Sequence, residues 1–402
     1  MFHSIYQMQS NGFMNNNYCY IACAGAGKTT HIIKAAHKLA TNTNKKIAIV
    51  TFTTHNQDTE RQKYYDLYSK IPKNIDICGW YTFLLDYIIK PFKGDIIEHL
   101  YDTHISLAFV DPPKIKSHKH KIPHYKKNDL KTKYLTSENG IYKDYLSEFA
   151  YNCLLKNRKL LTKRFEQIFD TIYFDEAQDF CAFDFDIIKF LIKETTVNCT
   201  ITIDPRQHTY SSCNSRRYSN FKGKLNLFCS EKINTKRHMY INVDYSKYGY
   251  SHRCDASICS LASEIYDGSF ATYPCTCNEC INKKSYYTKA RGVFFVFNKD
   301  AYKFANYFNV KVLTFNKVVN IDNVITNQRY NFGECKGDEF QSVLIYPTKD
   351  ILNWLMSRIE LAPNTKSRFY VAVTRAIFTV GIIVPNDFSA NRFNFPIWNP
   401  NS

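Results

Sequence analysis

The stretch YCYIACAGAGKTT, residues 18–30, decides the fold. A short apolar run ends in small residues, and HIIKAAHKLA follows with helical spacing, which predicts a strand, a tight loop and a helix. In such a loop glycines let backbone N–H groups close around phosphates, a lysine reaches the terminal phosphates, and a hydroxyl binds Mg²⁺. We therefore predict a phosphate-binding loop formed by Ala22, Cys23, Ala24, Gly25, Ala26, Gly27, Lys28, Thr29 and Thr30.

An ordinary glycine-rich turn is the alternative, because Gly-Lys-Thr is a short pattern and Ala22 stands where a first glycine is usual. The following chain favours the nucleotide site. KKIAIVTFT, residues 45–53, is typical of a buried strand in a parallel sheet, and a polar helix follows it from near Asn56. Ile75–Cys78 is a second such strand, again followed by a helical pattern.

Two acidic side chains end the next informative strand. DTIYFDEAQD, residues 170–179, brings Asp175 and Glu176 to the carboxyl edge of the sheet, where ligands bind in open α/β folds. One carboxylate can hold Mg²⁺ while the other polarises a water, as NTP hydrolysis requires. An acidic strand end that caps the next helix is the alternative. Asp204 and Gln207, in ITIDPRQHTY, should emerge at the same edge, although Asp-Pro is also an ordinary turn.

Length and charge narrow the class of protein. The 402 residues suggest two domains, and 53 basic against 36 acidic residues give a net charge of +17, which favours a polyanionic partner, nucleic acid or an acidic membrane surface. Pro112–Lys133 contains eight lysines and reads as a phosphate-binding insertion or a solvated loop. Without an apolar run long enough for a bilayer or for secretion, we expect an intracellular, cytoplasmic or nucleic-acid-associated protein without a membrane partner.

A second α/β region should begin near Lys236. We predict an N-terminal domain over 1–235, with a basic insertion at about 95–165, and a C-terminal domain over 236–402. The strands expected in the second domain are Met239–Val243, Gly292–Phe297, Val310–Phe315, Ser342–Tyr346 and Thr379–Val384.

In order, these segments resemble the motif series of UvrD/Rep-like superfamily 1 helicases over most of the chain. The motifs of the first half are ACAGAGKTT, VTFTTHNQDTERQ, GWYTFLLDYI, FDEAQD and IDPRQHTY. Those of the second half are YSHRCDASICSLASEIY, KVLTFNK, CKGDEFQSVLIYP and FYVAVTRA. The resemblance implies two RecA-like P-loop NTPase domains, with ATP and Mg²⁺ between them, and ATP-driven movement along single-stranded DNA in the 3′ to 5′ direction.

The resemblance also implies roles for individual residues. Lys28 and Thr29 would hold the phosphates, Thr29 and Asp175 would bind Mg²⁺, and Glu176 would act as the base. Further roles would fall to Gln207, which senses the γ-phosphate and the attacking water, to Arg253 and Arg375, which reach the γ-phosphate from the second domain, and to Gly337 and Glu339 beside the nucleotide. The aromatic residues expected on DNA are Phe52, Trp80 or Tyr81, and Tyr210, with burial in the core as the alternative for each.

Several departures from the family pattern bear on function. Ser211, Ser212 and Cys213 follow Tyr210 in place of an aromatic residue and an arginine, and His252 replaces the tyrosine usual before Arg253. The accessory insertions are short, so strand separation would need a protein partner that loads or completes the motor. The alternatives are a nucleic-acid-binding ATP switch or an ATPase that does not unwind, and RNA in place of DNA.

One cysteine cluster stands apart from these motifs. Cys275, Cys277 and Cys280 lie in CTCNEC, and Cys254, Cys259 or His252 would be the candidates for a fourth metal ligand. The Cys-x-Cys-x-x-Cys spacing is not a standard paired zinc knuckle, which favours free thiols in a loop.

Overall fold

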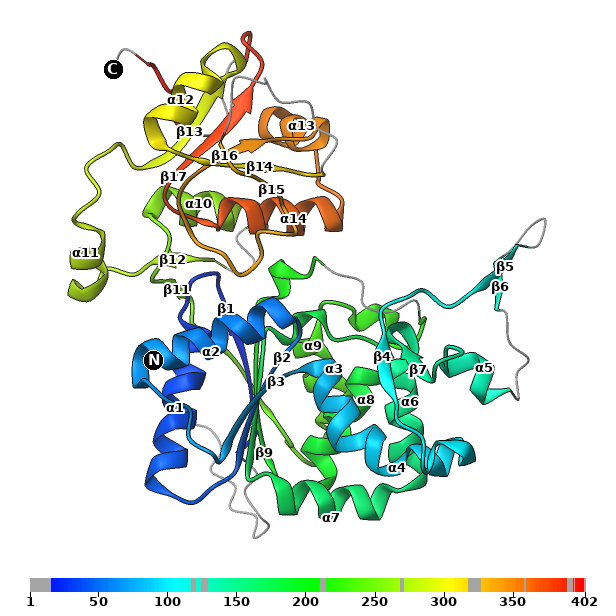
Figure 1. Ribbon diagram of the computed structural model, residues 1–402. Coiled ribbons are helices and arrows are strands. Elements are labelled where there is room, and N and C mark those ends of the chain that lie inside the picture. Colours follow the sequence, from blue (N-terminus) through cyan, green and yellow to red (C-terminus); the bar gives the residue numbers. More distant parts are fainter. Residues whose placement is uncertain are drawn as a thin grey trace.

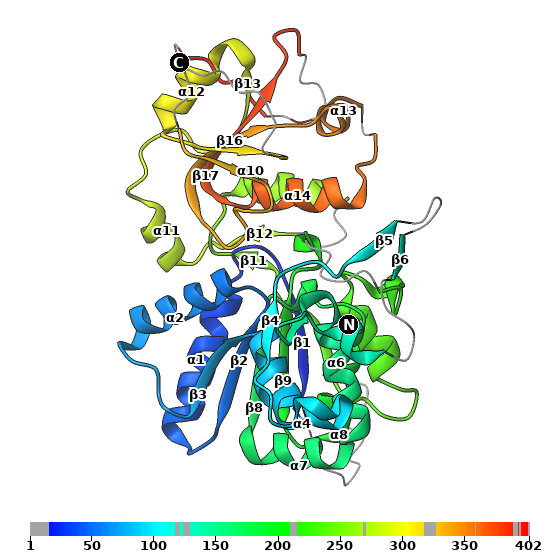
Figure 2. The same cartoon turned by 45° about the vertical axis from the view of Figure 1, so that its right-hand side comes forward.

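Two parallel sheets, each covered by helices on both faces, form the protein (Figure 1). The computed structural model describes residues 16–116, 121–123, 129–209, 215–267, 271–316, 327–357, 359–388, 393 and 395–400. Turning the molecule by 45° keeps one sheet domain above the other (Figure 2). The expected α/β fold with two RecA-like parallel-sheet domains is confirmed.

The N-terminal sheet has the strand order β10-β1-β9-β8-β2-β3, with every neighbouring pair parallel. Its strands are β1 (Tyr18–Ala22), β2 (Ile47–Thr51), β3 (Ile75–Gly79), β8 (Thr171–Asp175), β9 (Asn198–Ile203) and β10 (Asn242–Tyr248). All residues of β2 and β8 are buried, because helices cover both faces of a central parallel strand.

Alternate residues of β2 pack into two separate cores. Ile47 and Ile49 join the core under α1 (Lys28–Asn42) and α2 (Thr54–Tyr68). Ala48 and Val50 face the larger core, which is built with helices of the opposite face. Those helices are α6 (Lys143–Lys156), α7 (Arg158–Ile168) and α8 (Phe183–Glu194).

The predicted domain boundary is wrong by one strand. β10 pairs with β1, with Tyr18 opposite Asn242, so the first sheet continues to Tyr248 and does not end before Lys236. The expected strand Met239–Val243 is placed too early in the chain, because the strand that forms is β10 (Asn242–Tyr248), and it belongs to the first domain. Its sequence, NVDYSKY, is mostly polar because β10 is a largely exposed edge strand, and it carries no signal of a buried strand.

The C-terminal sheet has the order β13-β17-β16-β14-β15, again all parallel. Its strands are β13 (Gly292–Phe297), β14 (Lys311–Thr314), β15 (Arg329–Asn331), β16 (Phe340–Tyr346) and β17 (Ala376–Val384). The helices are α10 (Ala256–Glu264) and α14 (Pro363–Val373), which pack together, with α12 (Ala301–Phe308) in a separate core and α13 (Lys349–Ser357) beside α14. The four strands predicted after residue 290 are confirmed.

Between β3 and β8 lies the segment predicted as a basic insertion. The hairpin of β5 (Lys114–Lys116) and β6 (Lys121–Pro123) projects from the body in both views (Figures 1 and 2). The other elements there are α3 (Trp80–Phe83), α4 (Lys90–Ile96), β4 (Ser106–Ala108), α5 (Leu130–Tyr134) and β7 (Gly140–Tyr142), besides α6 and α7. Much of the lysine-rich stretch, residues 117–120 and 124–128, lies outside the described residues.

Short elements complete the chain. β11 (Tyr250–Ser251), β12 (Tyr273–Pro274) and α11 (Asn278–Lys284) lie at the junction of the two domains (Figure 1), and α9 (Leu225–Phe228) lies in the first domain between β9 and β10. Single helical turns occur at Leu84–Ile89, Glu98–Leu100, Ala177–Asp179, Pro205–Gln207, Ser219–Phe221, Cys229–Ile233 and Asn298–Asp300. Among the described residues, no helix is both long and apolar enough to cross a membrane.

Candidate functional site

The loop between β1 and α1 has the backbone shape of an anion-binding loop. Gly25 and Gly27 have φ of 72° and 77°, in the left-handed region that favours glycine. A Cβ atom on Gly25 would lie 2.5 Å from the Cβ of Arg253, so this position also lacks room for a side chain. The loop leads into the N-terminus of α1, whose free N–H groups and dipole favour a phosphate.

The basic and acidic residues predicted for the first domain come together above this loop. Lys28 Nζ lies 3.2 Å from Glu176 Oε1, and Thr29 Oγ1 donates to Asp175 Oδ2 at 2.5 Å. Lys28 and Thr29 lie at the start of α1, and the two acids lie at the carboxyl end of β8. These elements meet at the same edge of the sheet, because β1 and β8 run in the same direction. Thr202 also donates to Asp175, which fixes that carboxylate from β9.

Burial and charge set the ionisation of this pair. Burial acts to raise the pKa of Glu176, but Lys28, Lys336 and a hydrogen bond from Gln178 outweigh it and lower the pKa to about 2. Burial also raises the pKa of Asp175, with a further contribution from the Glu176 charge. Glu176 is therefore a fully ionised carboxylate held by Lys28, and Asp175 is the more easily protonated of the two.

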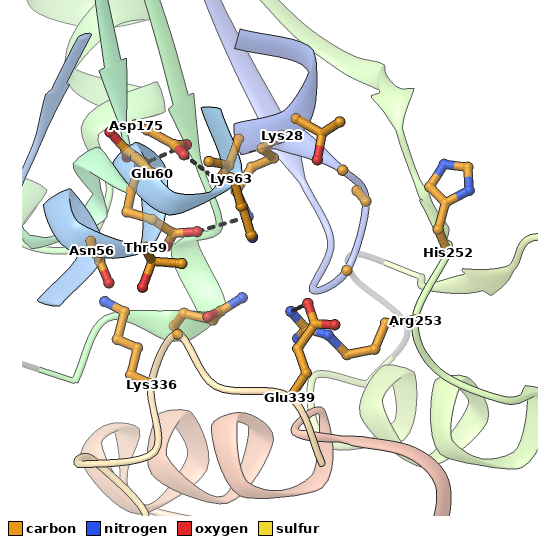
Figure 3. Close-up of a pocket in the computed structure, with 18 of the residues that line it drawn as sticks. Lys28, Asn56, Thr59, Glu60, Lys63, Asp175, His252, Arg253, Lys336 and Glu339 are labelled. Atoms are coloured by element: carbon orange, nitrogen blue, oxygen red, sulfur yellow. Dashed lines mark hydrogen bonds and ion pairs between the residues drawn. The ribbon is translucent and has the colours of Figure 1, made fainter. Parts of the chain in front are cut away.

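The second domain closes the site with two arginines. A cavity of about 360 Å³ between the domains is lined by Lys28, Asp175, Glu176 and Gln207 from one side and by Arg253, Lys336, Gly337, Glu339 and Arg375 from the other (Figure 3). The structure thus brings together the residues that the sequence predicted for the phosphates, the metal and the γ-phosphate sensors. Gly337, with φ of 102°, lets the loop before β16 approach the cavity.

Both arginines are held by contacts that aim them at the cavity. Arg253 donates to Glu339 Oε1 at 2.5 Å and to the carbonyl of Thr374 at 3.0 Å, and its buried Nε has no partner among the described residues. Arg375 donates to Gln207 Oε1 at 3.3 Å and to the Val371 carbonyl at 3.1 Å. Burial and the nearby Arg253 cation lower the pKa of Arg375, so an anion between the two arginines would stabilise both.

A buried polar group links the domains behind the cavity, and the sequence analysis did not assign all of its members. Asp204 accepts from Gln207 Nε2 and from Tyr370 Oη, both at 3.0 Å, while Tyr370 Oη also accepts from the N–H of Ala24 at 3.3 Å. Arg206 completes the group through Asp204 Oδ1 at 2.9 Å and Thr272 Oγ1 at 3.0 Å. Arg206 and Tyr370 stand within IDPRQHTY and FYVAVTRA, but the pattern does not show that they meet across the domain boundary.

Helix α2 contributes a wall of the cavity that sequence reasoning also missed. Its residues Asn56, Thr59, Glu60 and Lys63 line the cavity (Figure 3). Glu60 is only 2% exposed, and its Oε2 has no hydrogen-bond partner among the described residues. Burial, and next the charge of Asp175, raise the pKa of Glu60 well above its usual range. The signal in the sequence that could have pointed to these cavity residues was the polar helix predicted from near Asn56.

The raised pKa of Glu60 predicts a pH dependence of stability. The folded protein prefers the protonated form, so the stabilising contribution is complete below the ordinary pKa and is lost as pH rises through the folded-state pKa. Between pH 5 and pH 8 we expect the unfolding temperature of Glu60→Gln to rise relative to that of wild type. The difference in the free energy of unfolding between the two proteins should grow by up to about 1.4 kcal/mol per pH unit. Parallel pH curves for Glu60→Gln and wild type would contradict this prediction.

The aromatic residues predicted to contact DNA have different environments. Trp80 is completely buried and donates from Nε1 to Asp184 Oδ1 at 2.8 Å, so its ring is a core residue and is not accessible to a base. The expectation that Trp80 contacts DNA is therefore wrong, because its ring packs in the aromatic-rich core. Phe52 and Tyr81 are half-buried and pack edge to face, with centroids 5.7 Å apart. Tyr210 lies outside the described residues.

A second, larger cavity lies between the domains. Its volume is about 950 Å³, and basic and aromatic side chains from both domains line it, among them Lys222, Lys224, Tyr245, Tyr266, Lys366 and Arg368. Arg206 of the buried polar group also reaches its wall. This cavity therefore adjoins the structure that connects Gln207 to the second domain.

Comparison with known proteins gives likenesses among solved structures. No protein-family model and no curated protein matches the sequence. Among solved structures, the chain is similar to the arterivirus nonstructural protein 10, a helicase in complex with DNA, at 17% identity and a TM-score of 0.41. The similarity covers 92% of this chain and 61% of that one, so the present chain spans less than two thirds of that protein's length.

Proposed function

We propose that this chain is a superfamily 1 DNA helicase or translocase of UvrD/Rep type that hydrolyses ATP in the cleft between its domains. The observation that carries the proposal is the 360 Å³ cavity, where a phosphate-binding loop and an acidic pair face two arginines of the other domain. A nucleoside triphosphate with its metal supplies the charges that this arrangement lacks. Phosphoryl transfer needs positioning and charge stabilisation at these points.

The donors present suit Mg²⁺. Thr29 offers a hydroxyl and Asp175 a carboxylate, both hard oxygen ligands, at the end of the phosphate-binding loop. These two residues would hold the ion, which when bound neutralises charge on the β- and γ-phosphates. Glu176 would not bind the ion, since its oxygens contact Lys28 and Gln178.

ATP binding should rearrange the Lys28–Glu176 ion pair. The terminal phosphates compete for the Lys28 ammonium, which lies at the mouth of the loop. The Lys28 charge is the strongest influence that lowers the pKa of Glu176. When the Lys28 ammonium pairs with phosphate in place of Glu176, the pKa of Glu176 therefore rises and the carboxylate becomes a better base. Glu176 then accepts the proton of the attacking water, and Gln207 orients that water next to Arg375.

The arginines couple chemistry to domain movement. Arg253 and Arg375 belong to the second domain, so they reach the γ-phosphate only when the cleft is closed. Gln207 contacts Arg375, and Asp204 contacts Tyr370, so hydrolysis and phosphate release change contacts across the boundary. The same boundary lines the larger basic cavity, which makes it the proposed site of the nucleic-acid track.

We assign single-stranded DNA to that track, with 3′ to 5′ movement, and keep Phe52, Tyr81 and Tyr210 as proposed base contacts. Lysines and arginines neutralise phosphates, and aromatic faces stack on bases without sequence preference. Matched DNA and RNA strands separate the DNA proposal from an RNA track, since only RNA offers a 2′-hydroxyl.

A translocase or ATPase without unwinding activity is the second candidate. Between Arg253 and Lys336, the described chain forms only elements of the second sheet domain, with α11 and β12 at the junction. Among the described residues no separate accessory domain stands between them. Duplex unwinding would then require a partner protein, and a strand-displacement assay with the chain alone distinguishes the two candidates.

Two cations that line the larger cavity provide a test of the track. The half-buried Arg368 lines it from the second domain, and the exposed Lys224 lines it from the first domain. We expect the Lys224→Ala, Arg368→Ala double variant to bind single-stranded DNA at least tenfold more weakly, with a salt dependence reduced by about one to two phosphate contacts.

Fluorescence anisotropy at several salt concentrations measures this effect. The control is Lys163→Ala, an exposed lysine on α7 at the opposite end of the N-terminal sheet. Unchanged affinity and salt dependence in the double variant would place the track elsewhere.

A further inference from the structure

A cluster of three cysteines and one histidine lies beside the nucleotide cavity. One nitrogen of His252 and the sulfur atoms of Cys275, Cys277 and Cys280 all lie within 4.8 Å of one another. His252 Nδ1 is 3.2 Å from the sulfur of Cys280. The spacing in CTCNEC favoured free thiols, but the structure adds a histidine 23 positions earlier in the chain.

Local folding brings the four side chains together. β11 pairs with β12 in parallel, and the N–H of Cys275 donates to the carbonyl of Ser251 at 2.9 Å, so His252 and Cys275 leave the ends of two adjacent strands. Cys277 precedes the first residue of α11, and one turn of that helix returns Cys280 to the same side. Each ligand is thus placed by backbone hydrogen bonds.

Packing explains Cys280, which is buried, but it does not explain Cys275 or Cys277. All other described cysteines are buried and behave as small apolar side chains, whereas Cys277 is exposed and Cys275 is half-buried. The two other candidates for a fourth ligand point elsewhere, because Cys254 donates to the carbonyl of Thr374 and Cys259 to that of Cys254. His252 is therefore the fourth member of the cluster.

Metal chemistry does explain the arrangement. Cys₃His is one of the usual structural zinc sets, and Zn–S bonds near 2.3 Å place tetrahedral ligands about 3.8 Å apart. The four atoms need to contract only slightly from their spread of up to 4.8 Å to reach this geometry.

We propose that His252, Cys275, Cys277 and Cys280 bind one Zn²⁺ ion. Four protein ligands leave no open position for substrate, so the ion has a structural role. The metal would join the ends of β11 and β12 and the start of α11 into a single clasp, which we define as residues 250–253 and 273–284.

The clasp bears directly on the nucleotide cavity. The N–H of His252 donates to the Gly25 carbonyl of the phosphate-binding loop at 2.9 Å, and Arg253 follows immediately in the chain. Lys283 of α11 lines the same cavity. The zinc ligand His252 is therefore a positioning residue for Arg253, a role that rests on the proposed function, whereas metal binding itself does not.

Metal content tests the site independently of activity. Purified, tag-free protein should contain one zinc per chain by mass spectrometry, and the Cys277→Ser, Cys280→Ser double variant should contain almost none. Cobalt substitution should produce the thiolate charge-transfer and tetrahedral bands in wild type and not in the double variant. Cys153→Ser is the matched control, because serine can keep the bond to the Phe92 carbonyl, and its zinc should be unchanged.

Two results would overturn the site. One is a zinc content near zero after incubation of the reduced chain with zinc, and the other is equal metal binding by the double variant. Iron and sulfide in place of zinc would also contradict the assignment.

Activity of the same variant tests the positioning role. If the clasp aims Arg253, the folded zinc-free variant should hydrolyse ATP roughly tenfold more slowly, with circular dichroism unchanged. A wild-type rate without zinc would overturn positioning while leaving the zinc site intact. If wild type binds zinc but never hydrolyses ATP, the proposed function fails and the zinc site stands.

Discussion

Replacement of Lys28 by alanine should reduce ATP hydrolysis by roughly 10³-fold or more. The Lys28 side chain is 6% exposed, and its ammonium forms an ion pair with Glu176 at 3.2 Å. Its loss removes the charge that meets the terminal phosphates. It also leaves Glu176 without its ion-pair partner, so weaker nucleotide binding should accompany the slower turnover.

Two controls separate chemistry from folding in this experiment. Lys38→Ala changes an exposed lysine on the same helix and should retain wild-type turnover. Lys28→Met keeps an apolar stem in the buried position and should be as inactive as Lys28→Ala. Substantial hydrolysis by a folded Lys28→Met protein would mean that the loop does not hold the phosphates.

Replacement of Arg375 by alanine should lower the maximal turnover about 10³-fold, with a smaller effect on nucleotide binding. Arg375 comes from the second domain and contacts Gln207, so its charge is best used when the γ-phosphate is being transferred. Arg375→Lys should recover little activity, because an ammonium cannot match the several N–H donors of the guanidinium.

Fluorescent nucleotide binding and phosphate release, measured on the same samples, check this prediction. Lys349→Ala, an exposed lysine at the start of α13, is the control for loss of a cation from the second domain. Equal losses in binding and turnover would make Arg375 a ground-state contact, and unchanged turnover would remove it from the catalytic group.

Local patterns were sufficient to predict most of the sheet strands. β2, β8 and β17 are mostly apolar, because a central parallel strand is buried on both faces. β13 is an edge strand of its sheet, but its sequence is apolar as well. The loop before α1 and the acidic end of β8 follow such strands, so their meeting at one sheet edge could be predicted from order alone.

Contacts between distant segments could not be predicted in the same way. β10 is polar because it is an exposed edge strand, and only its pairing with β1 assigns it to the first domain. Trp80 is aromatic, but whether its ring faces a base or the core depends on Asp184, which is 104 residues away. The same holds for His252 and the three cysteines, and for the contact between Tyr370 and Asp204.

Phosphate release from the wild-type chain tests the central claim most directly. It is measured without nucleic acid, with single-stranded DNA and with RNA of the same sequence, in parallel with Lys28→Ala. We predict strong stimulation by DNA that disappears in the variant. Background turnover with both polymers, in a chain that still binds nucleotide, would contradict the motor and leave an ATP-binding switch.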